Sequence, residues 1–262
     1  MSEPAKEELR ELLAIGLRAA DVARDVVMPL FESDIGSELK ADGTPVTAAD
    51  RDAEEAIRRF IERECPGHGV LGEEFGESPS SGPYRWVVDP IDGTKAFVHR
   101  VPLFGTLIAL EYQGAPVAGI IACHAAKAVI AGAKGLGATL NGRPVRVSNT
   151  DSLERSTALM TSVQSMYRYH PRAFAALNDR ANLVRTWGDC FGYLSVGAGR
   201  AELMVDPVMN YWDVAALYPV ITEAGGRITT IDGALGPGGS VVATNGLLHD
   251  EVLSILALDS PT

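Results

Sequence analysis

The sequence predicts a layered α+β sandwich of helices and sheets. Three observations lead to this fold class: helical periodicity early in the chain, short apolar runs between Gly and Pro in the middle, and alternating strand-like and helix-like segments afterwards. The 262 residues are enough for one large domain or for two subdomains that share a core. The polar stretch Ser148–Glu154 predicts a boundary between an N-terminal α+β subdomain, residues 1–148, and a C-terminal α/β subdomain, residues 149–262.

Two helices are expected first. Apolar residues recur at spacings of three and four from Glu7 to Phe31, with charged residues between them. A turn-rich stretch follows, in which Asp42-Gly43 has the form of a hairpin tip. Thr47-Ala-Ala-Asp50 has the form of a capping box, so a second helix is expected to begin near Thr47 and to be ended by Pro66-Gly67.

The middle of the chain is expected to form a sheet that is mostly antiparallel. Its strands are predicted at Val70–Leu71, Trp86–Val88, Gly105–Glu111, Val117–Cys123 and Ala128–Gly132, and Asn141-Gly142 predicts a further hairpin. In the last part, strands are predicted at Thr157–Val163, Leu183–Thr186 and Glu202–Val205, and helices at Pro171–Arg180, Cys190–Ala198 and Tyr211–Ala224. Two more strands and a helix at Leu247–Leu258 follow.

Composition and charge exclude several classes of protein. Hydrophobic residues make up 46% of the chain, yet no apolar run approaches the roughly 20 residues of a membrane span, and the acidic first residues resemble no signal or transit peptide. The net charge of −11 and the scattered basic residues disfavour nucleic acid as a partner. Three cysteines (Cys65, Cys123 and Cys190) form no CxxC pair, which favours reduced thiols over a disulfide frame or a zinc site. A cytoplasmic protein is therefore expected.

The segment Asp89-Pro-Ile-Asp-Gly-Thr94 combines candidate metal ligands with candidate phosphate-binding groups. Pro90 lacks an N–H group, so the preceding strand is expected to stop at Asp89 and a tight turn to bring Asp92 back alongside it. Two carboxylates with the Ile91 carbonyl between them offer hard oxygen ligands that suit Mg²⁺. The backbone N–H groups of the glycine and threonine that follow are placed to cradle a phosphate. The alternative is an Asp-rich surface turn.

Three further acids strengthen the metal interpretation. Glu73 lies between glycines after an apolar pair, Asp50 opens the second helix, and Asp213 lies in the first turn of a late helix. Each has a structural alternative: a solvated loop, a helix cap, and an interaction with the helix dipole. If these three acids converged with Asp89 and Asp92, their charge of about −5 would be self-repelling without two or three Mg²⁺ ions. Such a site is typical of two-metal phosphate hydrolases.

These segments, in this order, resemble the inositol monophosphatase family. The matching stretches are Asp42–Asp50, Gly72–Glu74, Asp89–Thr94 and Trp212–Ala216, and the similarity extends from the first helix to Gly225-Gly226. The resemblance implies the layered αβαβα sandwich that this family shares with fructose-1,6-bisphosphatases. It also implies a homodimer, two or three Mg²⁺ per active site, and direct attack on a phosphate monoester by metal-activated water, without a phosphoenzyme.

The resemblance assigns roles to particular residues. The implied metal ligands are Glu73, Asp89, the Ile91 carbonyl, Asp92 and Asp213. Asp50, Thr94 and Glu73 are the implied catalytic residues, with Asp50 and Thr94 activating the attacking water. Gly93 and Thr94 are implied to hold the phosphate. The implied residues around the substrate are Asp92, Gly188, Asp189, Asp206 and Asp213.

Within that family, three stretches look like the histidinol-phosphate phosphatases: Pro102–Leu110, Arg185–Tyr193 and Arg200–Asn210. The similarity implies hydrolysis of L-histidinol phosphate in histidine biosynthesis, with Asp189 or Asp206 pairing with the substrate ammonium. An inositol-1-monophosphatase or a broad sugar-phosphate phosphatase is the alternative, and a non-catalytic member that binds RNA or a transcription complex is a third. Tyr211, where a proline is common, and Lys95-Ala96 depart from the pattern of relatives.

Overall fold

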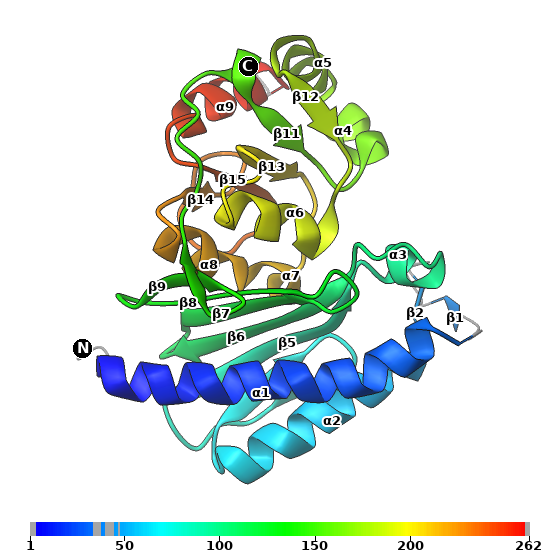
Figure 1. Ribbon diagram of the computed structural model, residues 1–262, viewed down its shortest axis with the longest axis vertical. Helices are drawn as coiled ribbons and strands as arrows, with labels where there is room; N and C mark the ends of the chain where they lie inside the picture. Colours follow the sequence, from blue (N-terminus) through cyan, green and yellow to red (C-terminus); the bar gives the residue numbers. More distant parts are fainter. Residues whose placement is uncertain (1–3, 34–37, 40–44, 47, 260–262) are drawn as a thin grey trace.

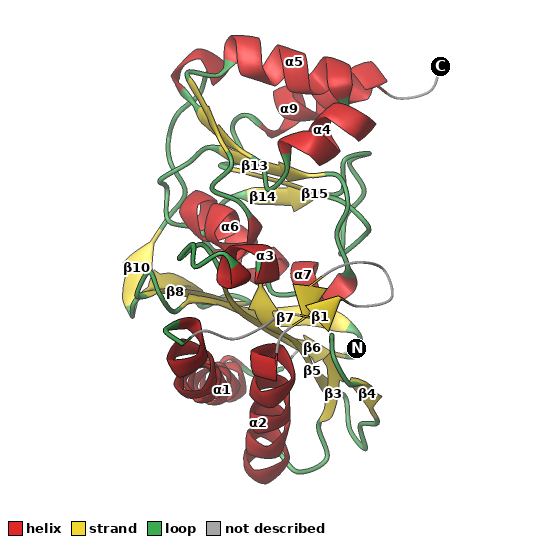
Figure 2. Cartoon of the chain, turned by 90° about the vertical axis from the view of Figure 1, so that its right-hand side faces the viewer, coloured by secondary structure: helices red, strands yellow, loops and turns green. Residues whose placement is uncertain are grey.

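Five layers of secondary structure are stacked along the long axis of the molecule (Figure 1). The computed structural model describes residues 4–33, 38–39, 45–46 and 48–259. Two helices cover the outer face of an eight-stranded sheet, a second set of helices separates that sheet from a five-stranded sheet, and a third set covers the far face (Figures 1 and 2). The predicted αβαβα sandwich is confirmed.

The first layer consists of α1 (Lys6–Phe31) and α2 (Ala48–Glu64), which pack against each other and against the sheet. Both predicted helices are therefore confirmed. The short strands β1 (Glu38–Leu39) and β2 (Pro45–Val46) pair antiparallel between them. The predicted hairpin tip at Asp42-Gly43 and the cap at Thr47 lie outside the described residues.

The larger sheet has the strand order β10-β9-β8-β7-β6-β5-β3-β4. Its strands are β3 (Gly69–Gly72), β4 (Gly76–Ser78), β5 (Tyr84–Asp92), β6 (Gly105–Tyr112), β7 (Ala115–Cys123), β8 (Ala128–Ala133), β9 (Gly137–Leu140) and β10 (Arg143–Val145). Neighbours are antiparallel except β3 and β5, which are parallel. Asn141 and Gly142 join β9 to β10 with φ values of 49° and 75°, which confirms the hairpin predicted there.

Strand β5 continues through the proline of the acidic segment, so the prediction that it stops at Asp89 is wrong. Pairing with β6 resumes at Asp92 after a bulge between these two residues. The bulge accommodates Pro90, which has no N–H group for the ladder. The Pro90 carbonyl accepts a hydrogen bond of 2.8 Å from the Thr106 hydroxyl on β6. The bulge, rather than a turn beyond the strand, therefore sets the relative positions of the two aspartates.

The smaller sheet has the order β12-β11-β13-β15-β14. Its strands are β11 (Thr157–Leu159), β12 (Leu183–Arg185), β13 (Leu203–Asp206), β14 (Arg227–Thr229) and β15 (Val241–Thr244). The remaining helices are α3 (Thr94–Val98), α4 (Val163–Tyr169), α5 (Pro171–Arg180), α6 (Asp189–Gly197), α7 (Tyr211–Val214), α8 (Leu217–Glu223) and α9 (His249–Leu256), and short 3₁₀ turns span Leu153–Arg155 and Ala257–Asp259. Helices α6, α7 and α8 lie between the two sheets, and α4, α5 and α9 lie beyond the smaller one (Figure 1).

Two elements in this part differ from the prediction. The strand expected over Thr157–Val163 ends at Leu159, because the Ser162 side chain accepts a hydrogen bond from the Ser165 N–H and starts α4. The helix expected over Tyr211–Ala224 is two helices. Pro219 in α8 offers no N–H to the carbonyl four residues before it, which favours the break between α7 and α8.

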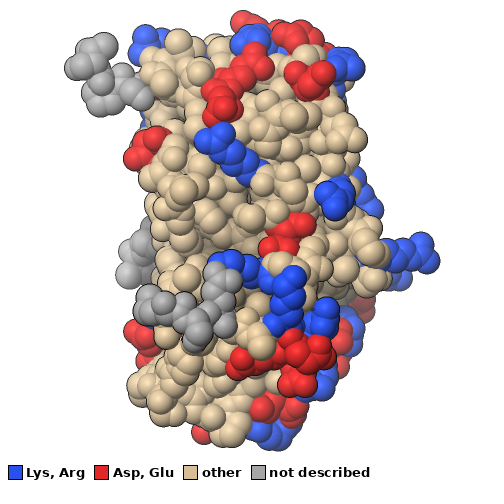
Figure 3. Space-filling view, turned by 90° about the vertical axis from the view of Figure 1, so that its left-hand side faces the viewer, with Lys and Arg blue, Asp and Glu red and all other residues tan. Residues whose placement is uncertain are grey.

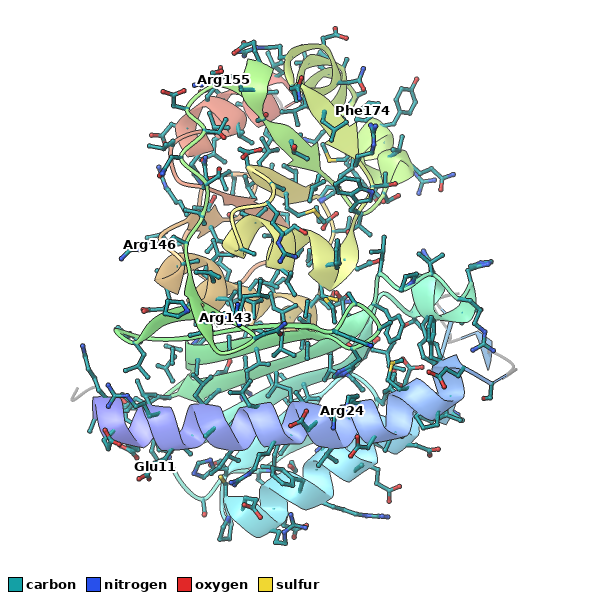
Figure 4. All side chains as sticks on the ribbon, in the orientation of Figure 1. Glu11, Arg24, Arg143, Arg146, Arg155 and Phe174 are labelled. Atoms are coloured by element: carbon teal, nitrogen blue, oxygen red, sulfur yellow. The ribbon has the colours of Figure 1, made fainter. Side chains whose placement is uncertain are left out.

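Side chains fill the space between the layers, while Glu11 and Arg24 lie on the exposed surface of α1 (Figure 4). The largest cluster of buried residues joins the inner face of the larger sheet to α6, α8 and the smaller sheet. It contains Ile121 and Leu217, from opposite sides of the expected subdomain boundary. The division after residue 148 stays a prediction.

Acidic and basic side chains are interspersed on the face drawn in Figure 3, most densely over its lower part. None of the helices that the structure describes combines the length and the apolar character that a membrane crossing needs. The three cysteines are free and buried. Cys123 on β7 and Cys190 on α6 approach each other, with 3.7 Å between their sulfur atoms.

Candidate active site

A cleft of about 810 Å³ lies between the end of β5 and the start of α6. Its walls come from the β3–β4 turn, the end of β5, the start of α3, the β11–α4 connection, the start of α6, and α7. The volume is within the range of small-molecule sites, roughly 300–1,000 Å³. Of the described residues that line it, five are acidic (Glu73, Asp89, Asp92, Asp189 and Asp213) and one is a lysine, Lys95.

Three of the predicted ligands converge in this cleft. One carboxylate oxygen each from Glu73, Asp89 and Asp213 lies within 4.8 Å of the other two. They come from the β3–β4 turn, β5 and α7. The Asp213 carboxylate also accepts a hydrogen bond of 2.8 Å from the Asn210 N–H, within a capping box that fixes the first turn of α7.

The charges of this group oppose one another. Burial, followed by the charges of Glu73, Asp92, Asp213 and Asp50, raises the pKa of Asp89 well above its usual value. Burial likewise raises the pKa of Asp213 to about 6. A cation among these oxygens would remove the repulsion, and convergent carboxylates are the hard donors that Mg²⁺ prefers. The donor set therefore fits a divalent metal ion.

The loop from Asp89 to Thr94 is held by its own hydrogen bonds. The Ile91 N–H donates to the Asp89 carboxylate over 3.0 Å, and the Thr94 hydroxyl donates to the Ile91 carbonyl over 3.1 Å. Asp92 accepts a hydrogen bond from the Cys190 N–H at the start of α6. Burial and the charges of Asp189 and Asp213 raise the pKa of Asp92 well above its usual value.

Gly93 brings the backbone of this loop close to the opposite wall. Its φ of 86° lies in the left-handed region that favours glycine. A β-carbon there would lie 3.0 Å from the Leu103 carbonyl oxygen and 3.2 Å from a carboxylate oxygen of Asp189. The bare backbone at Gly93 and Thr94 therefore forms part of the cleft surface, directly beside an acid that is not in the three-carboxylate group.

Asp189 is the first residue of α6, and its φ of 50° is unusual for a residue with a side chain. Its N–H donates to the Thr161 hydroxyl over 2.8 Å. Burial and the charge of Asp206 raise the pKa of Asp189 to about 7, although Lys95 lowers it. Backbone strain of this kind concentrates at functional sites. The neighbouring Gly188 is the N-cap residue of α6.

Asp206 lies behind the cleft wall and is 4% exposed. Its oxygens accept hydrogen bonds from the Thr161 N–H (3.0 Å), the Thr161 hydroxyl (2.9 Å) and the Tyr193 hydroxyl (2.8 Å). Because the same Thr161 hydroxyl oxygen accepts from the Asp189 N–H, Asp206 supports Asp189 through one intermediate residue. Contact between Asp206 and a substrate stays a prediction, and the described cleft lining does not include this residue.

Asp50 lies at the start of α2 and is 2% exposed. The described cleft lining does not include it, but its charge contributes to the raised pKa of Asp89, which places it near the metal-ligand candidates. A role in orienting water stays a prediction.

Comparison with known proteins agrees with this geometry. Residues 8–258 match the Inositol monophosphatase family. The chain belongs to the inositol monophosphatase family. Two curated members called histidinol-phosphatase are 43% identical to it: one from Mycobacterium tuberculosis over 93% of this chain and 97% of the relative, and one from Chlorobaculum parvum over 82% and 85%. A solved inositol monophosphatase from Zymomonas mobilis superposes with a TM-score of 0.84 at 32% identity, covering 97% of this chain and 99% of that one.

Members of this family are metal-dependent phosphomonoesterases, and the acidic cluster is consistent with membership. The cleft brings together all five predicted ligands, the two predicted phosphate-binding residues, and Asp189. Two contributors were not predicted from the sequence. Thr161, which links Asp189 to Asp206, had no motif, and Glu54, which contacts the turn after Glu73, is an acid on the buried side of α2. That placement on the apolar face was the available signal for Glu54.

Proposed function

We propose that this family member hydrolyses L-histidinol phosphate to L-histidinol and inorganic phosphate, with Mg²⁺ held by Glu73, Asp89, the Ile91 carbonyl, Asp92 and Asp213. The observation that carries the substrate choice is the position of Asp189. Its carboxylate lies beside Gly93, in the same cleft as the ligand candidates but outside the three-carboxylate group. The two 43% identical relatives called histidinol-phosphatase support the same substrate.

The phosphate end of the substrate fits the loop at Gly93 and Thr94. Bound Mg²⁺ would supply the positive charge that the phosphoryl oxygens require and would make water more acidic. The Thr94 hydroxyl hydrogen points to the Ile91 carbonyl, so its oxygen lone pairs are left to accept a hydrogen bond from the attacking water. Glu73 and Asp50 supply the remaining carboxylates for orienting that water. Two or three Mg²⁺ ions, a homodimer and a cytoplasmic location are predictions that accompany this proposal.

The organic end of the substrate carries an ammonium group, and Asp189 is its partner. Thr161 holds the backbone of Asp189 at the first residue of α6, so the position of its Cα atom is set before the substrate binds. A charge-assisted hydrogen bond in a partly buried cleft is stronger than a neutral one. A polyol phosphate, as in the inositol-1-monophosphatase or broad sugar-phosphate alternative, has no cation to offer this carboxylate.

Phosphate release from L-histidinol phosphate and from inositol 1-phosphate, measured with Mg²⁺, tests the proposal. We expect Asp189→Asn to lower kcat/KM for L-histidinol phosphate at least tenfold, since a charged hydrogen bond contributes about 1.5–3 kcal/mol. The same variant should change the slower hydrolysis of inositol 1-phosphate little. Asp179→Asn, at an exposed acid on α5, is the control and should behave as the wild type.

A preference of the wild-type protein for inositol 1-phosphate would contradict the substrate choice and favour the alternative. Absence of Mg²⁺-dependent hydrolysis with both substrates, together with RNA binding that weakens as salt increases, would favour the non-catalytic alternative.

A further inference from the structure

A charged pair is buried on α2 beneath the turn that carries Glu73. The Glu54 side chain is 0% exposed and the Arg58 side chain 18%, and their Oε1 and Nε atoms are 2.7 Å apart. Because the arginine neutralises the glutamate, the pair adds no net charge next to the acidic cleft. Replacement of a buried pair by apolar side chains is often neutral or stabilising, so general stability does not explain it.

The Glu54 carboxylate holds the backbone of this turn directly. One oxygen accepts a hydrogen bond of 2.7 Å from the Glu74 N–H, and the other accepts one of 3.2 Å from the Phe75 N–H. A β-carbon at Gly72 would lie only 2.0 Å from a Glu54 oxygen, so the carboxylate fits tightly against both ends of the turn. Glu73 lies between these contact points.

Arg58 ties the two flanking strands to the same carboxylate. Its guanidinium donates to the Val70 carbonyl on β3 over 3.4 Å and to the Gly76 carbonyl on β4. It also lies 3.4 Å from the Ser78 hydroxyl. The pair therefore contacts four backbone groups in and beside the β3–β4 turn. Glu54 accepts from two N–H groups, and Arg58 donates to two carbonyls.

We propose that Glu54 and Arg58 are positioning residues for the metal site: they hold the Glu73 carboxylate where it meets Asp89 and Asp213. The inference rests on the proposed metal-dependent function. Without the pair, the turn is expected to sample other conformations, so the cation would bind a site that is only partly assembled. The effect on metal affinity should therefore exceed the effect on the reaction at saturating metal.

The next residues along α2 offer matched controls. Glu55 and Arg59 form the same type of pair at the same spacing, but their side chains are 53% and 74% exposed. Two comparisons follow from this: Glu54→Gln against Glu55→Gln, and Arg58→Lys against Arg59→Lys. The lysine variant keeps the charge but has only one donor group in place of the planar guanidinium that reaches both carbonyls.

For each variant, the Mg²⁺ concentration at half-maximal phosphate release is measured, and so is the rise of Tm with added Mg²⁺ in the absence of substrate. We expect Glu54→Gln and Arg58→Lys to raise the half-maximal concentration about tenfold and to need correspondingly more Mg²⁺ for the same rise in Tm. Most of kcat should return at saturating Mg²⁺. Glu55→Gln and Arg59→Lys should match the wild type in both measurements.

A lower Tm without metal, combined with a half-maximal Mg²⁺ concentration within twofold of the wild type, would overturn the inference, because the pair would then be structural only. If Glu54→Gln does not fold, the same criterion applies to Arg58→Lys. A wild-type protein without any response to Mg²⁺ would instead overturn the proposed function, so the two failures are distinguishable.

Discussion

At the scale of single residues, Asp189 in the cleft lining and Asp206 behind it differ in their hydrogen-bond partners. Asp206 accepts three hydrogen bonds from Thr161 and Tyr193, whereas Asp189 donates a hydrogen bond to Thr161 through its backbone N–H. The resemblance to the histidinol-phosphate phosphatases implied that either acid could pair with the substrate ammonium. It could not distinguish them, since the partners of Asp206 are 45 and 13 residues away along the chain.

A buried histidine far from the metal-ligand candidates makes stability depend on pH. His249 at the start of α9 lies between two threonines, with its Nε2 3.0 Å from the Thr229 hydroxyl and its Nδ1 3.0 Å from the Thr244 hydroxyl. The Thr229 hydroxyl donates to the Thr230 carbonyl, and the Thr244 hydroxyl oxygen accepts from the Gly246 N–H. Nε2 is therefore the donor of the ring and Nδ1 an acceptor, an arrangement that protonation of Nδ1 would destroy.

Burial lowers the pKa of His249 from 6.5 to about 4. As the pH falls from 8 to 5, the unfolded chain binds a proton at this residue and the folded protein does not, so the free energy of unfolding falls. We expect this loss to be about 2 kcal/mol larger in the wild type than in His249→Gln. Urea unfolding at pH 8 and pH 5 measures it. An equal loss in both proteins would mean that His249 does not titrate as described.

At the scale of elements, the position of Asp213 depends on how α7 is attached to the larger sheet. Tyr211 at the start of α7 donates a hydrogen bond to Glu111, a fully buried acid on β6. Glu111 also accepts from Arg85 on β5 over 2.7 Å, and Arg85 reaches Glu77 on β4 over 2.8 Å. These contacts connect α7 to the strands next to Glu73 and Asp89.

The tyrosine contact can be tested by removal of one hydroxyl group. We expect Tyr211→Phe to lower the free energy of unfolding by about 1–2 kcal/mol, because a buried carboxylate loses a donor. It should also reduce the stabilisation by Mg²⁺, since α7 carries Asp213. Tyr218→Phe is the control: its hydroxyl donates to the Gly236 carbonyl, away from the cleft, so it should keep the full response to Mg²⁺. Identical Mg²⁺ responses of the two variants would contradict the role given to Tyr211.

At the scale of the whole molecule, the sequence predicted the layers and the acidic residues of the cleft. It did not predict the features that hold those residues in place. Helical and strand periodicity predicted α1, α2 and α5 and the core of the larger sheet, because burial of one face imposes these patterns. The bulge at Pro90 was missed because a proline that ends a strand and one inside a bulged strand look alike in sequence. The contact of Glu54 with the turn was missed because the N–H groups it accepts from are about 20 residues away, and its pairing with Arg58 has the spacing of any helical ion pair.

The central claim is that acids from three separate elements assemble one metal site. Isothermal titration calorimetry of the metal-free protein with Mg²⁺, beside Asp213→Asn, tests it most directly. The account predicts saturable binding of two or three ions to the wild type and at least tenfold weaker binding to the variant, which loses the carboxylate that α7 contributes. Absence of saturable binding, or equal affinities of the two proteins, would contradict it.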